Sequence, residues 1–204
     1  MHARIHVVRA DSKDTSNANV VVWLSPLGEK VDVAPLQHVR LIQKDKRFIP
    51  HLTVVTAGTQ VEFPNHDPFF HNVFSIYNGK RFDLGLYEAG TSRSVEFDRL
   101  GVSFIFCNIH PEMSGIVVVL NTPYYSVSDA KGDLYIRNVP PGHYRMTVWY
   151  ERSSTEALGR MTREVVMPAQ RELGTLEVPE VLPENVPHKN KYGKDYDPNQ
   201  PYTP

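Results

Sequence analysis

Three residues that can bind a transition metal follow one another at three-residue intervals near the middle of the chain. They are Cys107, His110 and Met113, in the segment FCNIHPEMSG at residues 106–115. A thiolate and a thioether are soft ligands that favour copper, and imidazole suits either copper oxidation state. The spacing leads to the hypothesis that one short loop supplies three ligands to a single copper ion.

The fourth ligand of such a site must come from elsewhere in the chain. A blue-copper site needs two histidines and one cysteine in a trigonal plane, with a weak axial methionine. His71 is the candidate, because it follows a polar loop and begins an apolar run in VEFPNHDPFFHNVFS, residues 61–75. Asn72 comes next, and an asparagine there can hydrogen-bond to the cysteine loop and hold the two ligand segments together. The predicted metal ligands are His71, Cys107, His110 and Met113.

Each of these residues also has a more ordinary interpretation. A lone cysteine is often a small buried hydrophobe, a methionine beside an apolar strand usually belongs to a core, and a single histidine is commonly solvated. The order His…Cys-x2-His-x2-Met, placed between strands, favours metal ligation over these readings. His66 lies five positions before His71 and is either an extra ligand or a solvated loop histidine.

The single cysteine excludes several other kinds of site. It rules out an internal disulfide, a Cys-x-x-Cys pair, a multi-cysteine zinc or iron–sulfur site and a two-cysteine CuA site. Its neighbours, Phe106 and Asn108, exclude the His-Cys-His sequence that multicopper oxidases need. A catalytic Cys–His dyad needs an accessible thiolate, whereas Cys107 ends an apolar strand. Four filled positions leave no room for a substrate, so we expect a protein that is not an enzyme.

The rest of the chain predicts short strands between turns. The prolines argue against long helices, and we expect residues 153–165 to form a loop with one helical turn. The sequence therefore predicts an all-β fold class. Apolar, β-branched runs that suit the strands of a β-sandwich occur at residues 20–24, 52–55, 61–63, 102–106 and 116–120.

Residues 38–120 resemble a cupredoxin of the plastocyanin, pseudoazurin and amicyanin group. The matching segments are FIPHLTVVTAGTQVEFPNHD, HNVFS and GVSFIFCNIHPEMSGIVVVL, and the Cys-x2-His-x2-Met loop is most similar to that of amicyanin. The resemblance implies a Greek-key β-sandwich with one type 1 copper site. It also implies that the ring of His110 meets solvent and a redox partner. The ligands it carries over are His71, Cys107, His110 and Met113, with Asn72 beside the first of them.

Residues 129–151 resemble a carboxypeptidase-regulatory or transthyretin-like β-sandwich. The match consists of the turn D-x-x-G, the turn NVPPG and an alternating strand after each. Only half of that sandwich follows the cupredoxin, and residues 1–26 look like its first two strands. We therefore expect a cupredoxin domain, 27–121, inserted into a second domain formed by 1–26 and 122–178. The alternative is that 1–26 extend the cupredoxin sheet.

A proline-rich tail, 179–204, completes the chain. Its composition gives it little capacity for a core of its own. Its tyrosines Tyr192, Tyr196 and Tyr202 either pin it to a domain surface or leave it disordered.

Composition limits the partners that the protein can have. Among 204 residues, 22 Lys and Arg balance 23 Asp and Glu, so the net charge of −1 indicates no nucleic-acid surface. No apolar run approaches the roughly 18 residues of a transmembrane helix, so we expect no membrane span. The start MHARIHVVRA lacks the apolar core of a signal peptide. Redox carriers of this type nevertheless work outside the cytoplasm, so we expect a periplasmic or secreted protein whose leader is absent from this chain.

The expected function is that of a type 1 copper protein carrying single electrons between redox protein partners in the cell envelope. The wider sequence also resembles bacterial proteins labelled methylamine-utilisation or plastocyanin-like, a label that establishes no substrate. Two other classes stay open at this point. One is a periplasmic copper-binding and delivery protein, and the other is a partner-binding module whose metal is structural.

Overall fold

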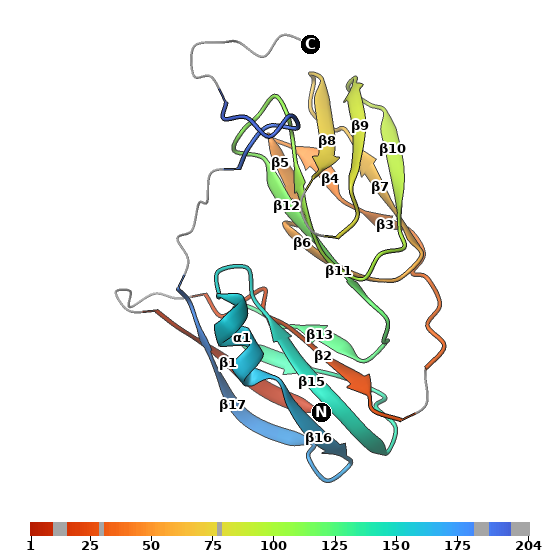
Figure 1. Cartoon of the computed structure of the whole chain (residues 1–204). Helices are drawn as coiled ribbons and strands as arrows, with labels where there is room; N and C mark the ends of the chain where they lie inside the picture. The colour runs from red at the N-terminus through yellow and green to blue at the C-terminus, as the bar shows by residue number, and fades with distance from the viewer. Residues whose placement is uncertain (10–15, 29–30, 77–78, 182–187, 197–204) are drawn as a thin grey trace. The chain divides into compact units, whose positions relative to one another are not determined.

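The chain is almost entirely β in the part that the computed structural model describes, which confirms the predicted fold class (Figure 1). The described residues are 1–9, 16–28, 31–76, 79–181 and 188–196. They divide into two compact units, which are described separately. The first lies within 1–32 and 122–186, and the second within 33–121 and 187–204.

The first unit contains two sheets. One has the strand order β14-β1-β17 and the other the order β13-β2-β15-β16. The strands are β1 (His2–Val8), β2 (Val21–Pro26), β13 (Tyr125–Val127), β14 (Asp133–Tyr135), β15 (Gly142–Trp149), β16 (Arg163–Met167) and β17 (Glu172–Pro179).

Strands from both ends of this unit's sequence share each sheet. β1 pairs in parallel with β17, which places Ile5 opposite Leu176. β2 pairs with β15 in antiparallel fashion, which places Val22 opposite Val148. All four side chains belong to one buried apolar cluster. The N-terminal strands and the strands after residue 122 therefore build a common core.

A helix of seven residues, α1 (Thr155–Met161), replaces the expected loop with one helical turn. The side chain of Ser154 caps its N-terminus by accepting a hydrogen bond from the backbone N–H of Ala157. Leu158 is buried in the core of the first unit. A helix this short is marginal by itself, so the cap and this buried anchor account for it. Within the described part of the chain, no helix has the length and apolarity needed to cross a membrane.

The second unit is a sandwich of two sheets and a hairpin. Its sheets have the orders β6-β12-β11-β8-β9 and β10-β7-β3, and β4 pairs with β5. The strands are β3 (Val39–Arg40), β4 (Ile42–Lys44), β5 (Arg47–Ile49), β6 (Leu52–Thr56), β7 (Thr59–Pro64), β8 (His71–Ser75), β9 (Phe82–Tyr87), β10 (Ser92–Phe97), β11 (Gly101–Phe106) and β12 (Ser114–Leu120).

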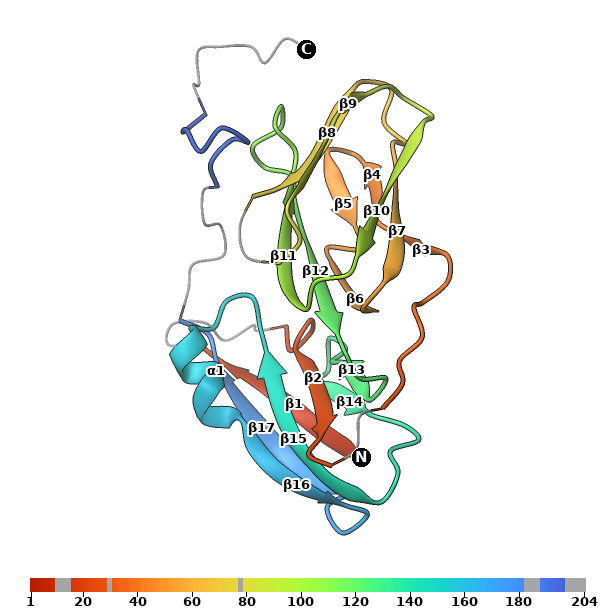
Figure 2. The ribbon, with the colours of Figure 1, turned by 45° about the vertical axis from the view of Figure 1, so that its right-hand side comes forward.

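The core of the second unit lies between its two sheets. Figure 2 shows β7 and β10 on one side of the unit and β11 and β12 on the other. Phe63 of β7 and Ile105 of β11 belong to the same buried cluster, which also contains Cys107 and Met113. The end of β11 and the start of β12 thus bring two predicted ligands to one end of this core.

Part of the C-terminal tail packs on the second unit. The hydroxyl of Tyr196 donates a hydrogen bond to the carbonyl oxygen of Cys107 at 3.1 Å. Tyr192 is 74% exposed, and Tyr202 lies outside the described residues. Of the two interpretations left open by the sequence, surface attachment therefore holds for residues 188–196.

The D-x-x-G turn of the first unit requires its glycine. Gly132 has a φ of +87°, and its carbonyl accepts the N–H of Ile5 at 2.7 Å. A Cβ at this position would lie 2.1 Å from the carbonyl oxygen of Ile5. We therefore expect Gly132→Ala to lower the free energy of unfolding by about 2 kcal/mol or more, measured by denaturant titration.

Gly174 provides a matched control in the same unit. Its φ of +67° is also positive, but a Cβ there would meet nothing within 4 Å. Gly174→Ala should therefore cost only about 1 kcal/mol of backbone strain. Equal losses in the two variants would show that the close approach of Gly132 to β1 contributes nothing.

Candidate metal centre

Three potential ligand atoms converge where β11 ends. The Sγ of Cys107 lies 3.7 Å from the Nδ1 of His71 and 3.6 Å from the Nδ1 of His110. The two nitrogens are 3.1 Å apart. Atoms that bind one transition-metal ion at about 2.0–2.3 Å are themselves separated by roughly 3–4 Å. The donor set therefore fits a single shared metal ion, and its atoms are of the kinds that copper prefers.

Strand pairing explains why residues so far apart in the sequence meet here. His71 opens β8, and β8 pairs with β11 through Phe74 opposite Phe106. Cys107 follows directly, and its N–H donates to the carbonyl of Met113 at 3.3 Å. The strand pairing sets the position of Cys107 beside β8. The hydrogen bond between Cys107 and Met113 closes the loop between β11 and β12.

Met113 lies in the buried core at this end of the sandwich. Its exposure is 0%, and it belongs to the same apolar cluster as Cys107. Its backbone N–H donates to the carbonyl of His110 at 3.0 Å, which tightens the loop. Its role as the axial ligand stays a prediction from the sequence.

Asp67 fixes the orientation of the His71 ring, and sequence reasoning missed it. Its Oδ2 lies 2.7 Å from the Nε2 of His71, and its carboxylate also accepts the backbone N–H groups of Asp45 and Lys46. Burial acts to raise the pKa of Asp67, but these hydrogen bonds outweigh it and lower the pKa. An ionised Asp67 holds the proton of His71 on Nε2 and leaves Nδ1 facing Cys107 with a free lone pair.

The pKa shifts of the donor residues suit metal binding. Burial raises the pKa of the Cys107 thiol, although backbone N–H groups, that of Asn72 foremost, act in the opposite direction. Burial lowers the pKa of His71 against the effect of Asp67, and burial together with His71 lowers the pKa of His110. Both imidazoles are therefore neutral at neutral pH, as ligation requires, and a metal ion would displace the thiol proton.

Asn72 acts on the site differently from the expectation. Its side-chain amide donates to the Oδ1 of Asp83 at 2.7 Å, and not to the cysteine loop. Successive side chains of a strand point to opposite faces, so a strand that turns His71 toward the core turns Asn72 away from it. The contact with the cysteine comes instead from the backbone N–H of Asn72.

The loop before β8 contains two further residues of interest, Phe69 and His66. Phe69 lies beside both ligand rings, with its centroid 5.2 Å from that of His71 and 5.5 Å from that of His110. It is 37% exposed, so it covers the rings only in part. His66 is exposed and lies outside the cluster of ligand atoms found in the described residues, which supports its interpretation as a solvated loop histidine.

Several solved structures are similar to this chain. A purple cupredoxin from Nitrosopumilus maritimus is 26% identical over 41% of this chain and 100% of its own, with a TM-score of 0.37. A reduced amicyanin mutant is 19% identical over 48% of this chain and 99% of its own, with a TM-score of 0.38. A copper-containing nitrite reductase from Thermus scotoductus is 22% identical over 57% of this chain and 28% of its own, with a TM-score of 0.40. No protein-family model and no curated protein matches the sequence.

The hydrogen bond between Asp67 and His71 leads to a prediction for the Asp67→Asn variant. Asp67→Asn removes a buried negative charge and replaces one carboxylate oxygen by an NH2 group that cannot accept the hydrogen bond from Nε2, so that only an uncharged amide oxygen is left as an acceptor. We expect the affinity for Cu(II) to fall by about tenfold or more, as is typical when a ligand histidine loses its hydrogen-bond partner. The reduction potential should rise, because the lost negative charge favoured the oxidised ion. Competition titration and redox titration measure the two quantities.

Asp98 offers a control for the loss of a carboxylate. It lies in the same unit, and its side chain is 56% exposed and pairs with Lys80 at the surface. Asp98→Asn should leave both the affinity and the potential unchanged. Similar effects from the two substitutions would mean that net charge, and not the orientation of His71, controls the site.

Proposed function

We propose that the protein is a type 1 copper protein that carries single electrons between redox protein partners. The observation that carries this proposal is the convergence of Cys107, His71 and His110, whose ligand atoms all lie within 4.8 Å of one another. Two neutral imidazoles and one thiolate form the trigonal donor set of blue copper. Met113 would be the axial ligand, and the backbone N–H of Asn72 would support the sulfur.

Copper bound at these residues would supply a one-electron couple, and the protein would control its surroundings. Cys107 and His71 are completely buried, so the chain excludes water from two of the three donor atoms. His110 is only half-buried, which makes its ring the ligand nearest to solvent and to a partner. Asp67 holds the His71 ring in one orientation, so little rearrangement would accompany a change of oxidation state.

A filled set of four ligands also supports a protein without enzyme activity of its own. With His71, Cys107, His110 and Met113 bound, no coordination position stays open for a reactant. The nitrite reductase that is similar to this chain is a copper-containing enzyme, but the similarity covers only 28% of the reductase chain. A buried donor set also disfavours copper delivery, since an acceptor must reach the ion to remove it.

The first unit would serve as an adaptor. We propose that it is the carboxypeptidase-regulatory-like sandwich expected from residues 1–26 and 122–178, with the cupredoxin domain, 27–121, inserted between them. The pairing of β1 with β17 and of β2 with β15 supports this arrangement. The chemistry of the site supports a location in the periplasm or outside the cell, where copper carriers of this kind work.

The visible spectrum of the Cu(II)-loaded protein tests the proposal. We expect an intense thiolate-to-copper band near about 600 nm. Cys107→Ser should abolish the band, because a hydroxyl cannot replace the thiolate. Met113→Leu should keep the band and shift the reduction potential, because the axial ligand tunes the couple. The buried Met146 of the first unit provides the control, since Met146→Leu should change neither.

The outcome also separates the rival functions. A blue band that survives in the Cys107→Ser protein would contradict the ligand set. Rapid loss of copper to a chelator, without reversible reduction and oxidation, would favour a delivery protein. Partner binding that is unchanged in the Cys107→Ser protein would favour a module with a structural metal.

A further inference from the structure

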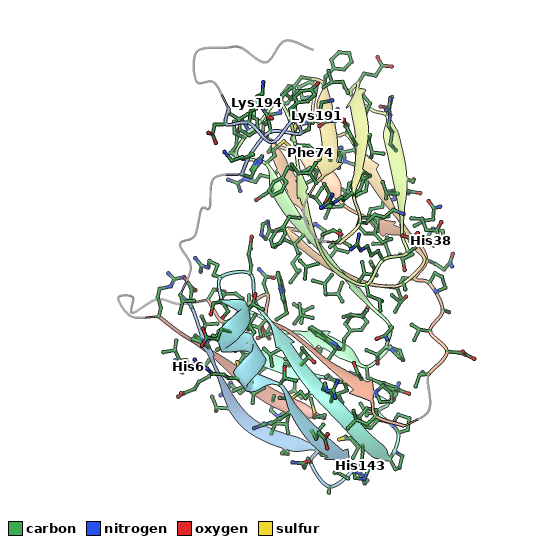
Figure 3. The ribbon with its side chains drawn as sticks, in the orientation of Figure 1. His6, His38, Phe74, His143, Lys191 and Lys194 are labelled. Atoms are coloured by element: carbon green, nitrogen blue, oxygen red, sulfur yellow. The ribbon has the colours of Figure 1, made fainter. Side chains whose placement is uncertain are left out.

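Residues 188–196, here called the strap, cover the outer face of β8 and β11 beside the metal centre. Phe74 and Phe106 lie opposite each other in these strands and are buried, yet neither belongs to the core cluster between the sheets. The ring of His188 stacks on Phe106 with centroids 4.0 Å apart, and it lies 6.5 Å from Phe74. Figure 3 shows Phe74 close to Lys191 of the strap. The strap therefore helps to bury two aromatic residues next to the ligands.

Tyr196 and Lys191 attach the strap to the ligand loop by hydrogen bonds. The hydroxyl of Tyr196 donates to the carbonyl oxygen of Cys107 at 3.1 Å. The backbone N–H of Lys191 donates to the Oδ1 of Asn108 at 3.0 Å. With the ring contact to Phe106, the strap touches three consecutive residues centred on the cysteine.

A third connection runs through β9. The Nζ of Lys191 lies 2.9 Å from the Oδ2 of Asp83, and the Oδ1 of Asp83 accepts the side-chain amide of Asn72 at 2.7 Å. Hydrogen bonding from the backbone N–H of Asn72 in turn acts to lower the pKa of the Cys107 thiol. The strap is thus also linked, through Asp83 and Asn72, to the strand that carries His71.

The strap is itself an ordered turn. Asn190 is buried, and its Oδ1 accepts the backbone N–H groups of Tyr192 and Lys194 at 3.0 and 3.1 Å. Its backbone N–H donates to the carbonyl of Lys194 at 2.8 Å, and its carbonyl accepts the N–H of Gly193 at 2.9 Å. These hydrogen bonds hold the backbone before Tyr196 in one conformation. The position of the tyrosine relative to Cys107 is therefore well defined.

We propose that Tyr196 is a positioning residue of the metal centre, which holds the backbone of Cys107 in place and tunes the charge balance at the metal. This inference rests on the proposed function only where it concerns bound copper. The hydroxyl hydrogen is the positive end of the O–H dipole and faces the carbonyl of a ligand residue. A positive potential there favours the reduced ion, which carries less charge, so Tyr196 raises the reduction potential.

Tyr196→Phe tests the inference by removing the hydroxyl oxygen, which also lies 3.4 Å from the Nδ1 of His188. In the full-length, metal-free protein, we expect the backbone amides of the ligand loop, 108–110, to exchange with deuterium about fivefold faster, as loss of the hydrogen bond to the Cys107 carbonyl predicts. In the copper-loaded protein, the blue colour should remain. The ratio of reduced to oxidised protein at a fixed ambient potential should fall by about threefold.

Tyr135→Phe is the control, because it makes the same chemical change on a side chain of the first unit that is 54% exposed, whereas the hydroxyl of Tyr192 interacts with Lys191 of the strap. It should alter neither exchange nor potential. Identical behaviour of the two variants would overturn the inference. Faster exchange with an unchanged potential would overturn it as well, since the tyrosine would then be only structural.

The measurements on the metal-free and the copper-loaded protein also separate this inference from the proposed function. A wild-type protein that binds copper without reversible redox behaviour would refute the proposed function. Faster exchange in metal-free Tyr196→Phe would still support the contact between the strap and the ligand loop. A reversible blue-copper protein in which Tyr196→Phe changes nothing would refute the inference alone.

Discussion

Two imidazole nitrogens and one sulfur face each other at 3.1–3.7 Å in the interior of the second unit. Each of the three atoms can offer a lone pair to one shared cation. Without a cation, the hydrogen bonds among these groups and the surrounding structure must hold the donors together. The rest of this unit can be understood as the means of keeping His71, Cys107 and His110 in that arrangement.

Three different kinds of interaction supply this support. The core between the sheets fixes the ends of β8 and β11, from which His71 and Cys107 extend. Asp67 joins the ring of His71 to the backbone of the β4–β5 turn, so that one carboxylate orients an imidazole and closes a hairpin. Residues 188–196 hold the cysteine loop from the outer face. Apolar packing, a buried charge and a distant segment therefore act on the same few atoms.

The sequence was informative where residue type and local spacing together determine which side chains meet. Cys107 and His110 share one turn, and His71 begins a strand after a polar loop, so residue type and spacing were enough to place them together. Asp67 was missed because a carboxylate in a loop carries no periodic signal, although it precedes His71 by only four positions. The side-chain partner of Asn72 depended on the register between β8 and β9, which no local pattern encodes. The attachment of Tyr196 depends on a contact 89 positions away along the chain.

The parallel pairing of β1 with β17 has a consequence for biosynthesis. Ile5 pairs with Leu176, so the first strand emerges from the ribosome long before its neighbour exists. Contacts of such long range form slowly, and domains tend to fold as units in the order in which they are made. The second unit can collapse on its own strands before the N-terminal strands have a partner. Closure of the first unit is then the later event, and a chaperone that shields exposed strand edges would be most useful during that interval.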